Sequence, residues 1–535
     1  MKKEKITALL LTAVMGLAAP ISAQAAPSYQ EAEKAALAKT LETLTSSYSQ
    51  QYAAYPVQAG VSNISLQLQD AGKAFLGMMV PADISWLNDL TFSANVGFDD
   101  SQLAETVDVL LNGSKICTME IYMDSETLDT YVRIPELADG YLKSTMEQIE
   151  AAEYNLDGLD SEYEEDAVDA ASSLQAQIFL SDYMKALPRL NEYLPKPEDL
   201  NTVLDRYATI FIDHTQETES GTDTLTVEGI SQECTTLDAI LDEEGATAAA
   251  NDVLTTARKD EELKAFIENL ETLSPDSGIS YNGFLEQIDS LMASLAEGST
   301  DDGTYVSSKI WLDSEDQIVG RILSINNAEE EIPLITWMAP SSGDTSAYSF
   351  QLHADDEILE LSGTGVTTGG KLNGTYEFSY NGIGMAAVDV MDYDTEAVKD
   401  GNFDGAYKLY FLPGMGEDEY AALGSFALEA KLSGDQTTST FGLTLTSSDA
   451  PMVTLVCDGT SGTGSVDFVD LGSLDKVYDT STDEGLTAFQ TEMTLDTIME
   501  NLLAAGMPET FLEDIMSPGE AYDDTMDDYS EYDAG

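Results

Sequence analysis

The stretch of sequence that most resembles a binding site is Asp400-Gly401-Asn402-Phe403-Asp404-Gly405. Oxygen-bearing side chains at Asp400, Asn402 and Asp404, followed by a glycine, match the first half of a calcium loop. Such a loop needs a bidentate carboxylate at its twelfth position, because Ca²⁺ takes six to eight oxygen ligands. Here that position is Phe411. The pattern therefore predicts either a weak calcium site at Asp400, Asn402 and Asp404 or a glycine-rich turn that binds no metal.

The residues that most often perform catalysis are scarce. The chain has two histidines, His214 and His353, and neither has the neighbours that a zinc centre with three or four ligands would need. Its three cysteines are Cys117, Cys234 and Cys457. They are too few for a disulfide framework, although one pair could form, and we expect them to be small apolar residues inside sheets. We find no nucleophile-elbow, phosphate-loop or dinucleotide motif. The sequence therefore favours a protein that is not an enzyme and has no cofactor other than that calcium.

The chain is long and very acidic. Its 535 residues predict two domains, and 98 acidic against 23 basic residues give a formal charge of −75. Nucleic acid is excluded as a partner, because phosphate binding requires clustered Lys and Arg. With so many carboxylates, paired acids of the glycosidase type would occur by chance and carry no weight.

The N-terminus has the features of a secretory signal. Lys2, Lys3 and Lys5 precede an apolar stretch, 6–19, which is too short to span a membrane, and Ala23-Gln24-Ala25 is a small-x-small cleavage site. We expect a cleavable signal peptide, 1–25, and an exported protein in the cell envelope or outside the cell. No later stretch is apolar enough for a transmembrane helix.

Hydrophobic periodicity predicts alternating helical and β-rich regions. Residues 30–55 have helical spacing, and residues 61–134 alternate apolar and polar side chains as about five strands, with a hairpin at Asn112-Gly113. Helices are expected at 136–153 and 160–194, on either side of an acidic loop at 155–166. The segment 207–213 reads as a strand.

The most regular stretch lies between two β-rich regions. Strands are expected within 225–241, and Asp242 is a good N-cap for the first of three amphipathic helices that continue to about residue 295. Their apolar faces predict core packing rather than a cofactor site. Strands then continue through 305–470, with turns at Gly369-Gly370, Asn373-Gly374 and Asn381-Gly382. A helix is expected at 485–505 and a short one at 508–516.

These elements predict an α+β protein. Antiparallel meander sheets, able to curve into half-barrels, would each be covered by helices, and two sheet-bearing halves would be joined by a helical segment. The expected organisation is a signal peptide (1–25), an N-terminal half (26–241), a helical connector that packs on both halves (242–297), a β-rich C-terminal half (298–516) and a disordered acidic tail (517–535).

Three segments resemble known exported proteins. They are Tyr131-Val132-Arg133-Ile134-Pro135-Glu136-Leu137, Val227-Glu228-Gly229-Ile230-Ser231-Gln232-Glu233-Cys234-Thr235 and Asp260-Glu261-Glu262-Leu263-Lys264. They are similar to segments of uncharacterised exported proteins of Gram-positive gut bacteria, a likeness that implies no activity. At the level of architecture, a large antiparallel sheet backed by helices also resembles the LolA/LppX-like envelope carriers. That resemblance implies lipid held between a curved sheet and helices.

Two functions follow from these expectations. The first is an exported, non-enzymatic binding or carrier protein for an apolar or lipid-like ligand, which would lie between sheet and helices. The alternative is a cell-surface or matrix protein with a protein-interaction or structural role, which would bind cations weakly. The expected partners are thus a hydrophobic small molecule or an envelope protein.

Overall fold

The computed structural model describes most of the chain between residues 27 and 516. The described residues are 27–53, 59–79, 83–99, 101–145, 191–274, 278–296, 303–327, 330–354, 357–399, 402–412, 426–435, 437–462 and 466–516. The expected signal peptide, the acidic loop 155–166 and the acidic tail lie outside these residues.

The protein is α+β, with 21 described strands that are mostly antiparallel. It divides into two compact units, which we call unit 1 (Met1–Val57 and Glu162–Thr437) and unit 2 (Gln58–Ser161 and Thr438–Gly535). Each unit combines stretches far apart in sequence. The sequence instead indicates a division into consecutive segments, and that division stays a prediction.

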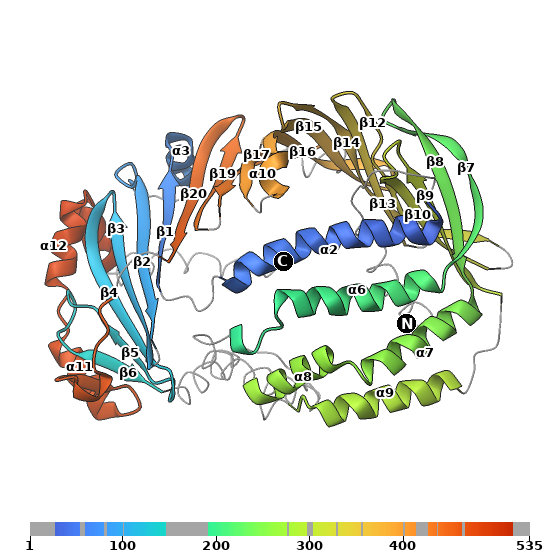
Figure 1. The fold of residues 1–535 in the computed structure, drawn as a ribbon. Helices are drawn as coiled ribbons and strands as arrows, with labels where there is room; N and C mark the ends of the chain where they lie inside the picture. The colour runs from blue at the N-terminus through green and yellow to red at the C-terminus, as the bar shows by residue number, and fades with distance from the viewer. Residues whose placement is uncertain are drawn as a thin grey trace, which may run out of the picture. The chain divides into compact units, whose positions relative to one another are not determined.

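The strands of unit 1 form one antiparallel run in which neighbours in sequence are neighbours in space, except that β11 pairs directly with β13 and β12 pairs beside it. They are β7 (Gln216–Val227), β8 (Ile230–Leu241), β9 (Tyr305–Leu312), β10 (Ile318–Asn326), β11 (Glu331–Met338), β12 (Ser341–Ser342), β13 (Thr345–Ala354), β14 (Glu357–Thr368), β15 (Lys371–Tyr380), β16 (Ile383–Asp394), β17 (Phe403–Phe411) and β18 (Phe426–Gly434). Figure 1 shows β7 to β17 arching over the long helix α2 (Tyr29–Ala53).

Four further helices of unit 1 lie on the far side of α2 from the sheet (Figure 1). They are α6 (Pro197–Asp213), α7 (Glu243–Ala257), α8 (Glu261–Leu273) and α9 (Tyr281–Ala296). The first half of α2 buries Tyr29, Ala32 and Ala36 against apolar residues of β8, β9 and β10. Small alanines let the helix lie close to the strands, and this contact forms the largest core cluster of the unit.

A buried ion pair fixes α2 on the sheet. The guanidinium of Arg321, on β10, donates to both carboxylate oxygens of Glu33, on α2, at 2.6 and 2.8 Å. Both side chains are at most 5% exposed. Burial alone would lower the pKa of Arg321, but the Glu33 carboxylate more than offsets this and raises it. Since each charge is buried, each requires the other to remain in place.

We predict that Glu33→Ala lowers the free energy of unfolding by about 3–5 kcal/mol, because the Arg321 charge would be left buried without a partner. Denaturant unfolding followed by circular dichroism measures this loss. Glu42→Ala, at an exposed position on the same helix, is the control and should change stability by at most about 0.5 kcal/mol. Equal stabilities of the two variants would contradict the anchoring role of the pair.

The two stretches of unit 2 contribute strands to one sheet, in which β1 of the first stretch pairs with β20 of the second. Its strand order is β19-β20-β1-β2-β3-β4-β5-β6-β21, and of the described pairings only β6 with β21 is parallel. The strands are β1 (Ala59–Leu68), β2 (Asp89–Phe98), β3 (Gln102–Leu111), β4 (Ser114–Asp124), β5 (Thr130–Arg133), β6 (Tyr141–Ser144), β19 (Thr438–Ser447), β20 (Ala450–Ser461) and β21 (Val477–Asp479).

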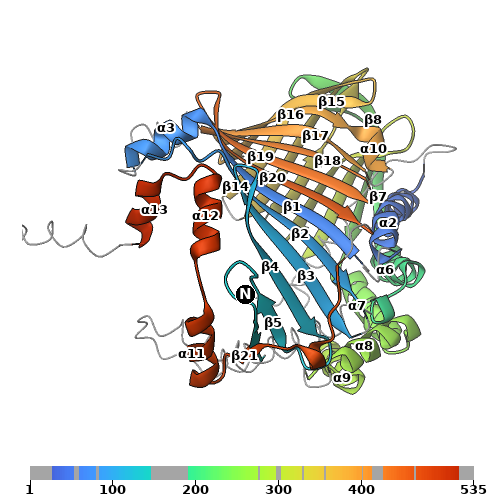
Figure 2. The same ribbon diagram turned by 90° about the vertical axis from the view of Figure 1, so that its left-hand side faces the viewer.

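The helices in the described residues of unit 2 are α3 (Asp70–Met79), α11 (Asp483–Glu492), α12 (Asp496–Ala504) and α13 (Glu509–Met516), all visible in Figure 2. The side-chain amide of Asn112, in the β3–β4 hairpin, donates to the carbonyls of Trp86 and of Ala505, the C-cap of α12, at 2.9 and 2.8 Å. Asn112 and Gly113 have φ values of 50° and 74°, so the predicted Asn-Gly hairpin is confirmed.

Four expectations about local structure were wrong. The segment 207–213 is the second half of α6, which starts at Pro197 and buries Ala208 and Ile212 one turn apart. Residues 136–145, expected to be helical, form turns and β6; the rest of that predicted helix lies outside the described residues. Asn373-Gly374 lies within β15 rather than in a turn. The predicted helix 485–505 is interrupted between α11 and α12, where Thr494 N–H donates to the Leu137 carbonyl.

Candidate functional site

One side of the sheet in unit 1 carries a continuous row of mostly apolar residues. Residues directly opposite one another in paired strands point to the same face. The register gives a row across nine strands, which runs Leu237, Ile310, Arg321, Trp337, Phe350, Leu361, Phe378, Ala386 and Phe411. At the β8–β10 end the row belongs to the core beneath α2, and Arg321 is neutralised there by Glu33.

The same face is exposed between β13 and β17. We call this part the apolar face; its large exposed members are Leu352, Leu359, Phe378, Ile383, Phe403, Leu409 and Phe411, which are 38–56% exposed. The rows that pass through Leu359, Phe378 and Leu409 contain no charged residue between β13 and β17. A contiguous exposed apolar surface of this kind marks a binding surface more often than a random feature of the exterior.

Two glycines beside the tyrosines of the apolar face allow β14 and β15 to approach closely. A Cβ at Gly363 would lie 2.1 Å from the Thr375 carbonyl oxygen, and a Cβ at Gly374 would lie 2.5 Å from that of Thr364. Only glycine permits this close approach of β14 and β15. The rings of Tyr348 and Tyr376 meet edge to face at 6.5 Å, and burial raises the pKa of both hydroxyls. These tyrosines therefore stay neutral.

Unit 2 has a shorter row of the same type. Phe441, Cys457, Ile64, Phe92 and Val109 lie opposite one another on β19, β20, β1, β2 and β3. Ile64 and Phe92 are 45% and 41% exposed. An exposed apolar sheet face is thus a property of each unit taken separately.

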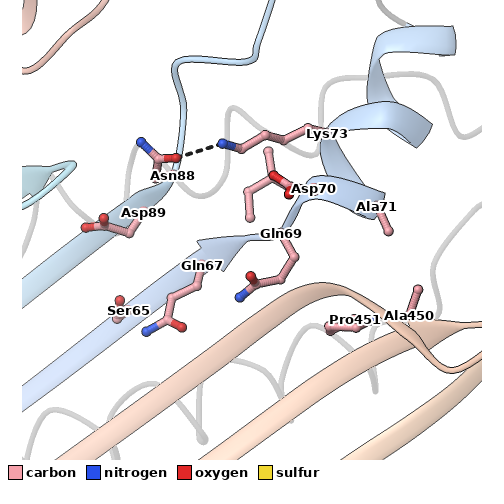
Figure 3. Close-up of a pocket in the computed structure, with 11 residues that line it drawn as sticks. Ser65, Gln67, Gln69, Asp70, Ala71, Lys73, Asn88, Asp89, Ala450 and Pro451 are labelled. Atoms are coloured by element: carbon pink, nitrogen blue, oxygen red, sulfur yellow. Dashed lines mark hydrogen bonds between the residues drawn. The ribbon is translucent and has the colours of Figure 1, made fainter.

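A polar pocket of about 850 Å³ lies on unit 2, where β1 passes into α3 (Figure 3). Lys73 reaches from α3 to donate to Asn88 Oδ1 at 2.7 Å and to the Ser85 carbonyl at 3.1 Å. Gln67 and Gln69 lie beside it with Asp70 and Asp89. The pocket offers amides and carboxylates but no cysteine or histidine, so its chemistry is that of hydrogen bonding to a polar ligand or water.

The position of α3 beside this pocket depends on Gly72. A Cβ there would lie 2.2 Å from the Met452 carbonyl oxygen, so any larger residue would displace the helix from β20. The neighbouring Gln69 N–H donates to the same carbonyl at 2.8 Å. The backbone thus sets the shape of the pocket wall.

In unit 1, a buried carboxylate organises the start of α8. Asp260 is the N-cap of α8 and accepts from Leu263 N–H at 3.0 Å, from the hydroxyl of Tyr207 at 2.9 Å and from the guanidinium of Arg206. Burial would raise the pKa of Asp260, but these hydrogen bonds outweigh it and lower the pKa. Burial and the nearby Asp260 raise the pKa of Tyr207. The cluster borders a pocket of about 450 Å³, and its groups satisfy one another.

We predict that Asp260→Asn costs about 2 kcal/mol of stability at neutral pH, as expected for hydrogen bonds to a charged acceptor. Because its folded pKa is lowered, the carboxylate stabilises fully above its ordinary pKa of 3.8 and loses this effect as pH falls through the folded value. The variant should therefore lose less stability than the wild type on acidification, measured by thermal melts against pH. Glu261→Gln, at an exposed position next to it, is the control; a wild-type pH slope in Asp260→Asn would contradict the prediction.

Two of the three expected calcium residues, Asn402 and Asp404, lie at the start of β17. Asp400 lies outside the described residues. The backbone N–H of Asn402 donates to the Ala397 carbonyl, and Asp404 accepts a hydrogen bond from Lys371 Nζ at 2.6 Å. Lys371 also lies 3.0 Å from Asp394. Within the described ranges no group of three His, Cys, Asp or Glu side chains is placed to hold a metal ion. The calcium site stays a prediction.

The cysteines lie in strands, as expected, and all three are free thiols. Burial raises the pKa of Cys117, and it raises that of Cys234 to about 11, so both thiols are poor nucleophiles at neutral pH. His353 lies on the polar side of β13, as predicted, and burial lowers its pKa. His214 caps the C-terminus of α6 rather than ending a strand, with Nε2 2.9 Å from Asp252.

Sequence reasoning missed the apolar face as a site. The alternation in β13–β17 does predict which residues share a face, but it gives no sign that α2 covers only one end of it. The pocket in Figure 3 was missed because its residues come from β1, α3, the start of β2 and the start of β20.

Comparison of the chain with models of protein families, with curated protein sequences and with solved structures found no match. No helix in the described part of the chain is both long enough and apolar enough to cross a membrane.

Proposed function

We propose that this chain is an exported binding or carrier protein without catalytic activity, and that it holds a lipid-like ligand by its acyl chain on the apolar face of unit 1. The observation that carries the proposal is the set of seven large apolar side chains exposed on one side of β13–β17. The secretory signal expected at residues 1–25 supports the exported location.

The chemistry of the apolar face favours hydrocarbon over a protein partner. Protein interfaces combine an apolar centre with hydrogen bonds about every 100–200 Å². The three rows that pass through Leu359, Phe378 and Leu409 contain no charged residue, and burial raises the pKa of Tyr348 and Tyr376 in the last of them. Each methylene that leaves water contributes about 0.8 kcal/mol, so a long acyl chain can offset the cost of association.

The proposal includes the finer architecture expected from sequence. Each sheet would curve as a half-barrel against its helices, which is the arrangement implied by the expected likeness to the LolA/LppX-like carriers. In unit 1, the contact of α2 with β8–β10 supports this arrangement, because it covers one end of the face and leaves β13–β17 exposed.

We predict that native mass spectrometry of the purified full chain detects a bound species of lipid mass. Removal of lipid should lower the melting temperature, and addition of oleate should restore it, because ligand binding stabilises only the folded state. If no adduct survives and oleate leaves the melting temperature unchanged, the carrier proposal fails and the surface-interaction alternative is favoured.

The same assay with variants tests the location. Phe378→Asp places a charge in the middle of the apolar face and should abolish the oleate shift. Val366→Asp is the matched control, because Val366 is 44% exposed on β14 but points to the opposite side from Leu359 and Leu361. Equal loss of binding in both variants would contradict binding at this face.

A further inference from the structure

The opposite side of the same sheet contains a separate cavity, of about 370 Å³, among β7, β8, β9, β10 and β11. Its polar lining includes Asp238, Ser307, Ser324, Asn326 and Glu331, with Tyr305 among its walls. Asp238 lies opposite Lys309, and Ser307 lies opposite Ser324, in adjacent strands. These residues alternate with Leu237, Ile310 and Leu323 of the core beneath α2, so the cavity and the apolar face lie on different sides of the sheet.

The cavity continues from a small core on its own side of the strands. Leu225, Cys234 and Trp311 form a buried cluster there, with Ile322 packed against it. Ile322 also lines the cavity. The side chains on this side of the sheet therefore change from apolar to polar along the strands, and the cavity lies at the polar end.

The polar end holds groups whose hydrogen-bonding capacity is unused. Ser324 is completely buried, and its Oγ has no hydrogen-bond partner among the described residues. Asn326, which is 7% exposed, donates its amide to Ser307 Oγ at 2.7 Å, so the hydroxyl hydrogen of Ser307 remains available. A buried hydroxyl without a partner is costly, which points to a polar occupant of the cavity.

The charges of the cavity favour an occupant that donates hydrogen bonds. Lys309, which lies opposite Asp238 in the next strand, has its Nζ 4.8 Å from the centre of the Trp311 ring and 3.9 Å from Asp223. Burial raises the pKa of Asp238; Lys309 opposes this, while Glu219 and Glu331 add to it. The partly buried carboxylate of Asp238 lines the cavity and offers acceptor oxygens to a ligand that donates hydrogen bonds. A metal ion fits less well, because an ammonium group lies in the same wall.

We propose that this cavity binds one sugar unit, either as a free sugar or as the terminal unit of a longer glycan. Sugar hydroxyls both donate and accept hydrogen bonds, which matches a wall of carboxylates, an amide, hydroxyls and one ammonium. Tyr305 is 36% exposed and offers an aromatic face for the C–H side of the ring. The volume lies within the range of small-molecule sites. This inference does not depend on the proposed lipid binding.

The test is isothermal titration of the full chain with glucose, galactose, N-acetylglucosamine and the tetrasaccharides cellotetraose and chitotetraose. We expect at least one of these probes to bind. Asp238→Ala and Tyr305→Ala should each weaken that binding by on the order of tenfold or more. Glu315→Ala, at an exposed position in the β9–β10 turn, should leave it unchanged. Melting temperatures near that of the wild type would show that each variant is folded.

The outcomes separate clearly. Tight binding of a monosaccharide identifies a free sugar as the ligand, whereas binding of tetrasaccharides alone identifies a glycan end. The proposal is overturned if none of the five probes binds, or if a probe binds equally well to the wild type, Asp238→Ala and Tyr305→Ala. Should either variant fail to fold, Asp238→Asn, which keeps the size of the side chain, replaces Asp238→Ala, and Tyr305→Leu replaces Tyr305→Ala.

Discussion

The arrangement of unit 1 depends on one buried charge. Arg321 lies third in a row of otherwise apolar side chains that crosses nine strands, and a guanidinium there is tolerable only with a carboxylate against it. Glu33 supplies that carboxylate from α2, at 2.6 and 2.8 Å. The pair therefore determines where α2 lies and, with it, which part of the row is core and which part is the exposed apolar face.

A strand has a period of two, so one sheet can present two different chemistries. In unit 1 the side that faces α2 is mostly apolar from β8 to β17, with Arg321 neutralised by Glu33, while the other side changes from the core around Trp311 to a polar cavity around Ser324 and Asp238. A ligand on one side contacts none of the side chains that bind a ligand on the other. The sheet can therefore serve as a rigid wall for two separate sites, one apolar and one polar.

Much of the fold was predictable, because its signals are local. The alternation of apolar and polar residues identified the strands of β1–β5 and β9–β20. As expected, Asp242 caps α7 by accepting from Gly245 N–H, and Asn112-Gly113 forms a hairpin turn. The errors arose where contacts with distant parts of the chain determine the local secondary structure. The segment 207–213 has strand-like composition, but it continues a helix that Pro197 starts; the helix after Gly485 is broken where Thr494 bonds to Leu137. Asn373-Gly374 resembles a turn, but Gly374 is required for close contact between strands. The candidate sites were beyond sequence reasoning, because exposure of Phe378 or burial of Ser324 depends on which element covers each face.

The central claim is that an acyl chain lies on β13–β17 of unit 1. The most direct measurement is photolabelling of the full chain with a diazirine fatty acid, followed by peptide mass spectrometry to locate the adducts. Our account predicts adducts concentrated in the peptides that contain Leu359, Phe378 and Leu409, and their loss when excess oleate competes. Adducts that fall mainly outside β13–β17, or that persist in the presence of oleate, would contradict it.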